Sequence, residues 1–266
     1  MNILVCVKQV PDTTEIKIDP VTKTLIRAGV PSIVNPYDGY ALEVAARIKD
    51  KEGGKVVLLS MGPPQAKDAI KECLAVGGDK GYLVSDRAFG GADTLATSYT
   101  LTMAIKTVEE LEGKFDIIFC GKQAIDGDTA QVGPEIAEHL GYPQVTYAVE
   151  AEMVNGELQV KRETEDGAEL IGVQLPALVT VTKPHFEIRY PTVKSKLAAN
   201  RAEIPTLTAA DVKNVETGRL GLAGSPTKVK KSFTPDVSKK GVKIKEETGA
   251  ESAKKLAALL SAAGVM

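Results

Sequence analysis

The sequence predicts an α/β fold with a doubly wound, mostly parallel sheet, an antiparallel hairpin extension and a C-terminal arm. Short apolar runs alternate with helical periodicity over residues 3–182, the pattern of a parallel sheet covered by helices on both faces. Two alternating segments flank Asn155-Gly156, a strong hairpin signal. Beyond Lys183 this rhythm ends, and prolines and basic clusters replace it.

The predicted central strands are apolar on both faces and mostly rich in β-branched residues, as buried parallel strands are. Apolar residues at helical spacing lie between them, at 41–48, 66–74, 101–111 and 132–140, and glycine pairs follow several of these patterns. This βαβα order is that of a Rossmann-like sheet. The strands are Ile3–Val7, Val56–Ser60, Gly81–Val84, Asp116–Cys120 and Leu178–Thr182.

Three segments depart from this rhythm. Residues 16–26 indicate a small hairpin or excursion, and residues 145–163 form the hairpin around Asn155-Gly156. From Lys183 onward we expect an extended arm that ends in one helix, Ala250–Ala263, with an apolar stripe that docks on this domain or on a partner. The expected division is therefore an α/β domain over 1–205 and an arm over 206–266.

Composition excludes several classes of protein. Hydrophobic residues make up 43% and charged residues 26%, as in ordinary globular proteins. The net charge of -2 argues against nucleic-acid binding through bulk charge. Cys6, Cys73 and Cys120 form no C-x-x-C pair and are expected to be small buried hydrophobes. The first apolar run is too short for a signal peptide or membrane span, so we expect a cytoplasmic protein in a reducing compartment.

Standard catalytic motifs are missing from the sequence. It contains no Walker phosphate loop, no G-x-G-x-x-G after the first strand, no H-E-x-x-H and no G-x-S-x-G. His139 and His185 are the only histidines, and His139 belongs to a helical pattern that ends at Gly141. A histidine metal site or a hydrolytic triad is not expected, and we predict no metal and no catalytic side chain.

The segment after the strand Asp116–Cys120 is the best candidate for a ligand site. Gly121 permits a sharp turn, and residues 126–129 are rich in turn and cap residues ahead of the next helix. Free N–H groups and the dipole at a helix start form an anion site, and Pro134 suits its first turn. The alternative is that Asp128 or Thr129 simply caps the helix, and the residues by themselves favour neither.

Two further segments follow strand ends. In the block Asn35–Glu43, Pro36 holds Asn35 extended, Asp38 can cap the next helix, and Tyr37 and Tyr40 can lie beside a flat ligand. An ordinary capped helix start is the alternative reading. At 59–66, Gly62 permits close backbone approach and Met61 offers a soft apolar lining for an adenine.

Taken together, these segments resemble the beta subunit of electron transfer flavoproteins over residues 1–205. The resemblance rests on the motifs at 4–10, Asn35-Pro36, Met61-Gly62-Pro63 and above all 121–129, in the family's order. It implies a heterodimer with an FAD-bearing alpha subunit and an adenine nucleotide in the beta subunit. The implied cofactor-binding residues are Cys6, Asn35, Pro36, Tyr37, Asp38, Met61, Ala124, Ile125, Asp126, Gly127, Asp128, Thr129, Ala130, Gln131, Val132, Gly133, Pro134 and Glu135.

The resemblance also implies a partner-recognition loop at 189–197. Its members here are Tyr190, Val193, Lys194 and Leu197. Val193 stands where the family has a leucine, so Leu197 is the alternative anchor. The lysines suit an acidic partner, although a solvated basic loop is the alternative reading.

The block at 35–40 resembles the electron-bifurcating type of the family more than the respiratory type. That type implies FAD rather than AMP in the beta site, NADH as electron donor, and ferredoxin or flavodoxin and a butyryl-CoA-type acyl-CoA dehydrogenase as acceptors. NADH oxidation is then expected only from the heterodimer. The alternatives are a plain electron shuttle with structural AMP, an ATP-binding sensor or ligase-type α/β domain, and a scaffold without nucleotide.

Overall fold

The structure is a computed structural model that describes residues 1–12, 31–230 and 241–266. Contacts divide the chain into two compact units. The first holds the sheet and helices α1 to α5, and the second holds α6 (Gly249–Ala262). The predicted excursion at residues 16–26 lies outside the described residues.

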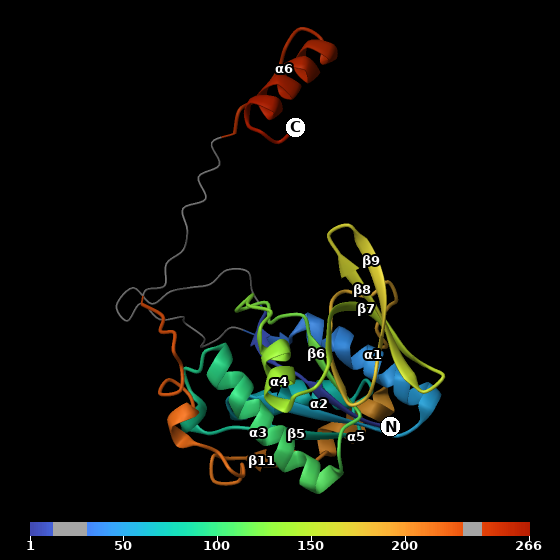
Figure 1. The fold of residues 1–266 in the computed structure, drawn as a ribbon, viewed down its shortest axis with the longest axis vertical. Coiled ribbons are helices and arrows are strands. Elements are labelled where there is room, and N and C mark those ends of the chain that lie inside the picture. The colour runs from blue at the N-terminus through green and yellow to red at the C-terminus, as the bar shows by residue number, and fades with distance from the viewer. Residues whose placement is uncertain (13–30, 231–240) are drawn as a thin grey trace. The chain divides into compact units, whose positions relative to one another are not determined.

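A nine-stranded sheet forms the centre of the first unit, in the order β11-β5-β4-β1-β6-β10-β7-β8-β9 (Figure 1). Its strands are parallel from β11 to β7, and the last two pairs are antiparallel. A separate antiparallel pair joins β2 (Gln9–Pro11) and β3 (Ser32–Val34). The sheet strands are β1 (Asn2–Cys6), β4 (Lys55–Met61), β5 (Lys80–Val84), β6 (Ile117–Gly121), β7 (Gln144–Val154), β8 (Glu157–Thr164), β9 (Gly167–Val173), β10 (Ala177–Val181) and β11 (Thr206–Leu207).

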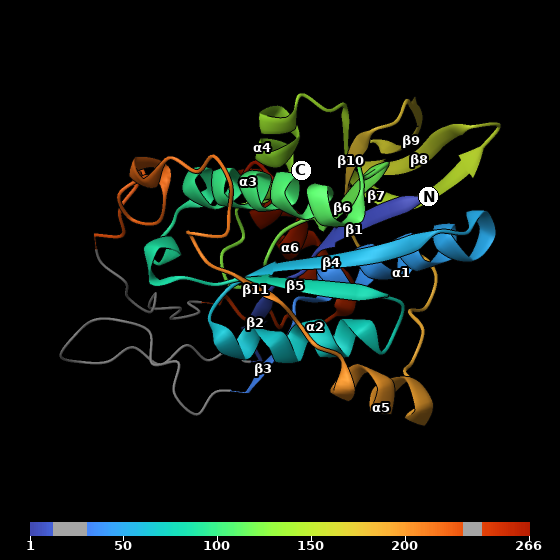
Figure 2. The same ribbon diagram turned by 90° about the horizontal axis from the view of Figure 1, so that it is seen from below.

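Helices cover both faces of the sheet, as Figure 2 shows. One face packs against α1 (Pro36–Glu52) and α2 (Lys67–Leu74), and the other packs against α3 (Thr94–Glu112) and α4 (Val132–Leu140). A fifth helix, α5 (Val193–Arg201), packs against α2. The doubly wound α/β architecture predicted from the sequence is therefore confirmed.

Burial explains the composition of the strands. Ile3, Leu4 and Val5 of β1 are fully buried, and neighbouring residues point alternately into the two hydrophobic clusters. Because both faces are covered, each position must be apolar, which produces the continuous apolar runs seen in the sequence.

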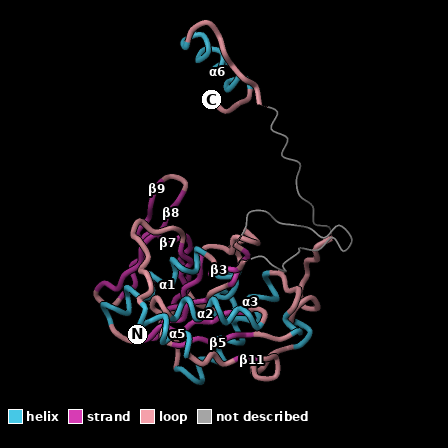
Figure 3. The backbone as a smooth tube through the Cα atoms, turned by 180° about the vertical axis from the view of Figure 1, so that it is seen from behind, coloured by secondary structure: helices cyan, strands magenta, loops and turns pink. Residues whose placement is uncertain are grey.

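The antiparallel extension consists of β7, β8 and β9, which project from the body of the sheet (Figures 1 and 3). The predicted hairpin is confirmed, with Asn155 and Gly156 both at positive φ in its turn. The sequence did not reveal β9, because most of this strand is exposed and carries no continuous apolar run.

The region after Lys183 differs from the extended arm that we expected. Thr192 and Ser195 form a capping box that starts α5, and β11 adds to the edge of the sheet beside β5. Residues up to Lys230 belong to the compact first unit, beyond the expected boundary at residue 205. The predicted C-terminal helix at 250–263 is present as α6, with its own capping box at Thr248 and Glu251.

The order of the strands defines where a ligand can bind. The chain runs outward from β1 to β4 and β5, and then crosses back to place β6 on the other side of β1. The connections therefore diverge between β1 and β6, and in open α/β sheets the crevice at the carboxyl ends of such strands is the usual ligand site.

Candidate functional site

A buried carboxylate, that of Asp38, joins the ends of β1 and β6. These ends mark the point where the strand connections diverge, which we call the switch point. Asp38, in the first turn of α1, accepts a hydrogen bond from the backbone N–H of Lys8 at 2.7 Å and another from Gly121 at 3.1 Å. Burial raises the pKa of Asp38 to about 7, and hydrogen bonds from Asn35, Lys8 and Gly121 offset only part of that effect. The carboxyl group therefore fixes the ends of β1 and β6 relative to α1.

Asn35 holds the loop that follows β6. Its amide Nδ2 donates to the Gln123 carbonyl at 2.8 Å, and its Oδ1 accepts from the Ile125 N–H at 3.1 Å. Asn35 is buried, and its own N–H donates to the Lys8 carbonyl at 2.9 Å. One side chain thus satisfies two backbone groups of the candidate phosphate loop.

The capping role considered for Asp38 is wrong. Asn35 is the N-cap residue of α1, and no side chain caps this helix start. Both polar side chains face the strand ends instead, where they hold segments far away in the sequence. The block therefore organises a site rather than only starting a helix.

Gly121 is required by the closeness of these elements. A Cβ at this position would lie 2.3 Å from Asp38 Oδ1 and 2.7 Å from the Tyr37 carbonyl carbon. Neither the buried carboxyl nor the backbone can move away easily, so only glycine permits this contact between β6 and α1.

The loop after Gly121 turns through unusual backbone conformations. The N–H groups of Gly127 and Asp128 both donate to the Ala124 carbonyl, and Asp128 and Ala130 have φ values of 52° and 54°. Asp128 Oδ1 accepts from Gln123 Nε2 at 2.7 Å, and Lys8 Nζ pairs with Asp126 Oδ1 at 2.7 Å. These contacts give the loop a defined shape.

The simple capping alternative fails at α4 as well. Its N-cap residue is Gln131, and neither Asp128 nor Thr129 caps it. Among the residues that the structure describes, no protein acceptor is found for the backbone N–H groups of residues 129–133. Together with the helix dipole, these donors suit an anion such as a phosphate.

Glu135 completes this end of the site. Its Oε1 lies 3.1 Å from the Thr94 hydroxyl, which also reaches Gln131 Oε1 at 3.1 Å. Glu135 Oε2 is buried and has no hydrogen-bond partner among the described residues. An acceptor in this state suits a ligand hydroxyl group. Pro134 occupies the third position of α4, within the first turn as predicted.

The remaining predicted cofactor residues lie at neighbouring strand ends. Cys6 ends β1 and Met61 ends β4, and both are half-buried against the cluster on the α3–α4 face. Cys73 and Cys120 are buried as expected, whereas Cys6 is only partly so. Tyr40 packs towards the core on the α1–α2 face, with its ring edge-on to Tyr37.

Sequence reasoning missed Lys8 and Thr94 as members of the site. Lys8 directly follows the first strand, and Thr94 begins α3 behind the capping residue Asp93. Positions directly after strands and at helix starts were therefore the available signal. His139, in contrast, packs edge-on against Tyr99, and burial lowers its pKa.

The predicted partner-binding residues form a separate exposed surface, which we call the α5 surface. Tyr190 is 85% exposed, Val193 79% and Leu197 53%. The expected loop is a loop only up to Thr192, because Val193 begins α5. Val193 and Leu197 are four residues apart, so they lie on one side of that helix, with Lys194 beside them.

A cavity of about 580 Å³ lies next to the α5 surface, between α1, α2 and α5. Leu42, Cys73 and Ala199 contribute to its lining, and the segment Ile188–Pro191 covers part of it. None of the residues of the loop at 121–135 lines this cavity, so the cavity is distinct from the switch-point site.

The fold is an open α/β sheet, and the N–H groups at the start of α4 lie at the carboxyl ends of its strands, where such folds bind anionic ligands. The Electron transfer flavoprotein domain matches residues 22–212. A protein of Megasphaera elsdenii named electron transfer flavoprotein subunit beta is 53% identical over 95% of this chain and 94% of that protein. The caffeyl-CoA reductase-Etf complex subunit CarD of Acetobacterium woodii is 50% identical over 88% of each. The chain belongs to the electron transfer flavoprotein family, among its beta subunits.

This family assignment confirms the resemblance inferred from the sequence and gives the chain a role in electron transfer. It leaves the ATP-binding sensor or ligase-type alternative without support. In the part of the chain that the structure describes, no helix is long and apolar enough to cross a membrane.

Proposed function

We propose that this chain, in a heterodimer with an FAD-bearing alpha subunit, binds a second FAD at the switch-point site and takes part in electron bifurcation. The observation that carries the proposal is the set of N–H groups at residues 129–133, which have no protein acceptor among the described residues. They follow a loop that Asn35 and Asp38 fix to the strand ends. A diphosphate can accept hydrogen bonds from several such N–H groups, and the partly buried Cys6 and Met61 at neighbouring strand ends suit an adenine.

In this proposal each part of the site has a distinct role. Residues 124–135 hold the phosphates, mainly through backbone groups, and Glu135 accepts a hydroxyl group of the ligand. Asn35 and Asp38 hold the backbone of the loop in position and do not contact the reacting atoms. Cys6 and Met61, with Pro36 and Tyr37, line the adenosine pocket.

The bound flavin supplies hydride and one-electron chemistry, and the protein supplies position and electrostatics. Electrons are proposed to come from NADH and to leave towards ferredoxin or flavodoxin and towards a butyryl-CoA-type acyl-CoA dehydrogenase. The name of the A. woodii relative, which describes a CoA-ester reductase complex, supports a partner of this kind. NADH oxidation is expected only from the heterodimer.

The α5 surface is proposed to dock the dehydrogenase. Large apolar side chains at 53–85% exposure beside Lys194 combine an apolar anchor with a positive rim. Val193 or Leu197 is the anchor. The C-terminal helix α6 is proposed to dock on the alpha subunit.

Nucleotide analysis tests the cofactor. The purified heterodimer is denatured, and the released FAD and AMP are separated by chromatography and counted per heterodimer. We expect about two FAD and no AMP, together with NADH oxidation that requires both acceptors. One FAD with one AMP and no NADH oxidation would support the plain shuttle instead, and a heterodimer without any beta-site nucleotide would support a scaffold.

A further inference from the structure

The segment between β10 and α5 carries the α5 surface but contains no helix or strand of its own. It covers residues 182–192, includes the exposed Tyr190 and leads directly into the exposed Val193. A connection without regular structure needs side-chain contacts to hold one conformation, since it has no ladder of backbone hydrogen bonds.

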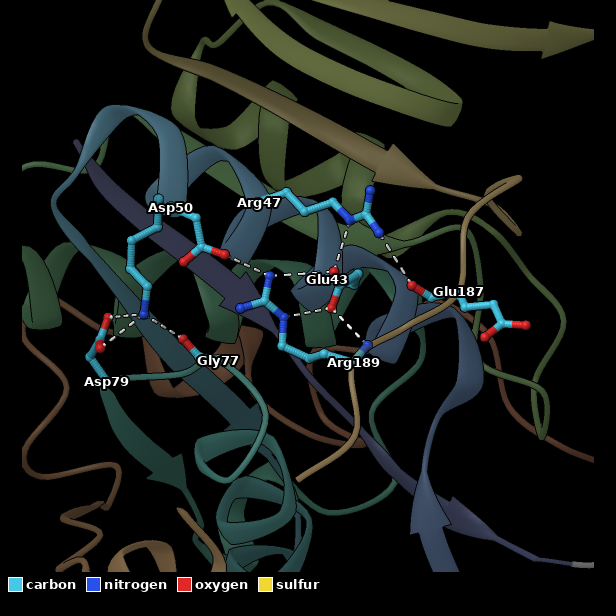
Figure 4. Close-up of polar contacts among 8 residues, drawn as sticks. Glu43, Arg47, Asp50, Gly77, Asp79, Glu187 and Arg189 are labelled. Carbon is cyan, nitrogen blue, oxygen red and sulfur yellow. Dashed lines mark hydrogen bonds and ion pairs between the residues drawn. The ribbon is translucent and has the colours of Figure 1, made fainter. Parts of the chain in front are cut away.

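A single carboxylate of α1 accepts three hydrogen bonds from this segment (Figure 4). Glu43, with a side chain only 5% exposed, accepts from Arg189 Nε at 2.8 Å, from the Arg189 backbone N–H at 3.1 Å and from Arg189 Nη2 at 3.3 Å. It also accepts from Arg47 Nε at 2.8 Å. Both the guanidinium fork and the main chain of Arg189 are therefore fixed by one group.

Two neighbours extend the contact along the same side of α1. Asp50 Oδ2 accepts from Arg189 Nη2 at 2.9 Å, and Arg47 Nη2 donates to the Glu187 carbonyl at 3.3 Å. The Arg47 guanidinium also stacks 3.8 Å from the centre of the Phe186 ring. Glu43, Arg47 and Asp50 follow the i, i+4, i+7 spacing of one helix face.

The hydrogen bonds to Glu43 favour its charged form. Burial raises its pKa, but hydrogen bonds from Arg189 and then from Arg47 outweigh burial and bring the pKa below its ordinary value. Arg189 in turn has a raised pKa because it donates to Glu43. The pair is ionised at neutral pH, and each partner keeps a second ion-pair contact, Glu43 with Arg47 and Arg189 with Asp50.

We infer that Glu43 is a positioning residue for partner docking: through Arg189 it holds residues 186–189, and so presents the α5 surface in one orientation. This inference rests on the proposed docking role of that surface. The same helix holds the nucleotide loop through Asn35 and Asp38 at its other end, so both functional surfaces are aligned on one rigid element.

The first test measures hydrogen exchange of backbone amides in the full chain. Glu43→Gln keeps the shape of the side chain and removes its charge, and Arg189→Gln removes the contact from the more exposed partner, while Arg47 still pairs with Glu43. Glu52→Gln is the matched control, since Glu52 lies at the exposed end of the same helix. We expect amides of residues 186–192 to exchange at least about tenfold faster in both variants, as for the loss of a charge-assisted hydrogen bond, and unchanged in the control.

The second test separates docking from chemistry in the heterodimer. With a butyryl-CoA-type dehydrogenase as the varied electron acceptor, Glu43→Gln should raise KM about tenfold, while kcat at saturating acceptor and the nucleotide content stay unchanged. A purely structural ion pair would lower the amount of folded heterodimer or its kcat, but would not give this split between KM and kcat. Val193→Asp serves as the positive control, because it places a charge within the proposed apolar anchor.

The outcomes separate the inference from the proposed function. Unchanged exchange at 186–192 in Glu43→Gln overturns the inference whatever the kinetics. A raised KM in Val193→Asp together with an unchanged KM in Glu43→Gln overturns the inference alone. An unchanged KM in both variants overturns the proposed docking surface, and with it the positioning role.

Discussion

Replacement of Asp38 by asparagine should remove a large part of the pH dependence of folding stability. The carboxyl has an ordinary pKa of 3.8 and a folded pKa of about 7, because it is buried at the ends of β1 and β6. Between these values the folded chain keeps a proton that the unfolded chain has lost. The free energy of unfolding therefore contains a contribution that is complete below pH 3.8 and is lost as the pH rises through 7.

The two pKa values set the size of the effect. Each unit of difference corresponds to about 1.4 kcal/mol, so Asp38 alone should lower the free energy of unfolding by about 2.5 kcal/mol between pH 5 and pH 8. Asparagine has no titrating group, so the variant should lack this decrease. The asparagine amide has one acceptor oxygen where the carboxyl has two, so the N–H of either Lys8 or Gly121 loses its acceptor. This loss should lower the free energy of unfolding by about 1–3 kcal/mol at either pH.

Urea denaturation followed by circular dichroism at pH 5 and pH 8, without added nucleotide, measures this contribution. The quantity to compare is the change in unfolding free energy between the two pH values, in the natural chain and in Asp38→Asn. Asp166→Asn is the control, since Asp166 lies exposed in the turn between β8 and β9. A pH dependence equal in Asp38→Asn and the natural chain would refute the assignment of a raised pKa to this carboxyl.

Two further perturbations test the site and the sheet edge. Gly121→Ala brings a Cβ to 2.3 Å from Asp38 Oδ1, so we expect nucleotide affinity to fall more than about tenfold in equilibrium dialysis, whereas Gly127→Ala, with no atom within 4 Å of the new Cβ, should bind normally. Glu112→Gln should lower the free energy of unfolding by about 2 kcal/mol at pH 7, because Glu112 accepts from Lys55 and Lys80 at the starts of β4 and β5 and from Tyr82 within β5. Its pKa is lowered from 4.5 to about 2, chiefly by hydrogen bonds from Lys55 and Lys80 that outweigh its burial, so the stabilisation exists above 4.5 and is lost as the pH falls through 2. The deficit of the variant should therefore shrink between pH 5 and pH 2, and a constant deficit would contradict this explanation.

Much of the fold could be read from the sequence because both sheet faces are covered. Five central strands, α2 and α4 were predicted close to their observed bounds, since apolar runs and helical periodicity report burial directly. The patterns at 41–48 and 101–111 covered only parts of α1 and α3. The elements that escaped prediction are β9, β11 and α5, which are exposed or short. Helix α5 has only one buried residue, Ala199, and its start is marked by the Thr192–Ser195 capping box rather than by an apolar stripe.

The candidate site was predictable as a set of positions but not as a set of roles. Asn35, Asp38 and the loop at 121–129 were recognised, yet Asp38 was considered as a helix cap. Its actual partner Gly121 is 83 positions away, and no local pattern reports such a contact. Lys8 and Thr94 were missed for the same reason, since Lys8 meets Asp126 across 118 positions.

The sequence by itself determined the parallel sheet, the glycine at the end of β6, the turn residues ahead of α4 and the family of this protein. These properties depend on residues that are neighbours in the chain, or on the average polarity of a whole segment. Only the tertiary structure decided that α1 holds the loop after β6 at one end and the segment before α5 further along, where Glu43 meets Arg189 across 146 positions. A buried charge gains its partners from the packing of distant elements, so its role exists only once the chain has folded.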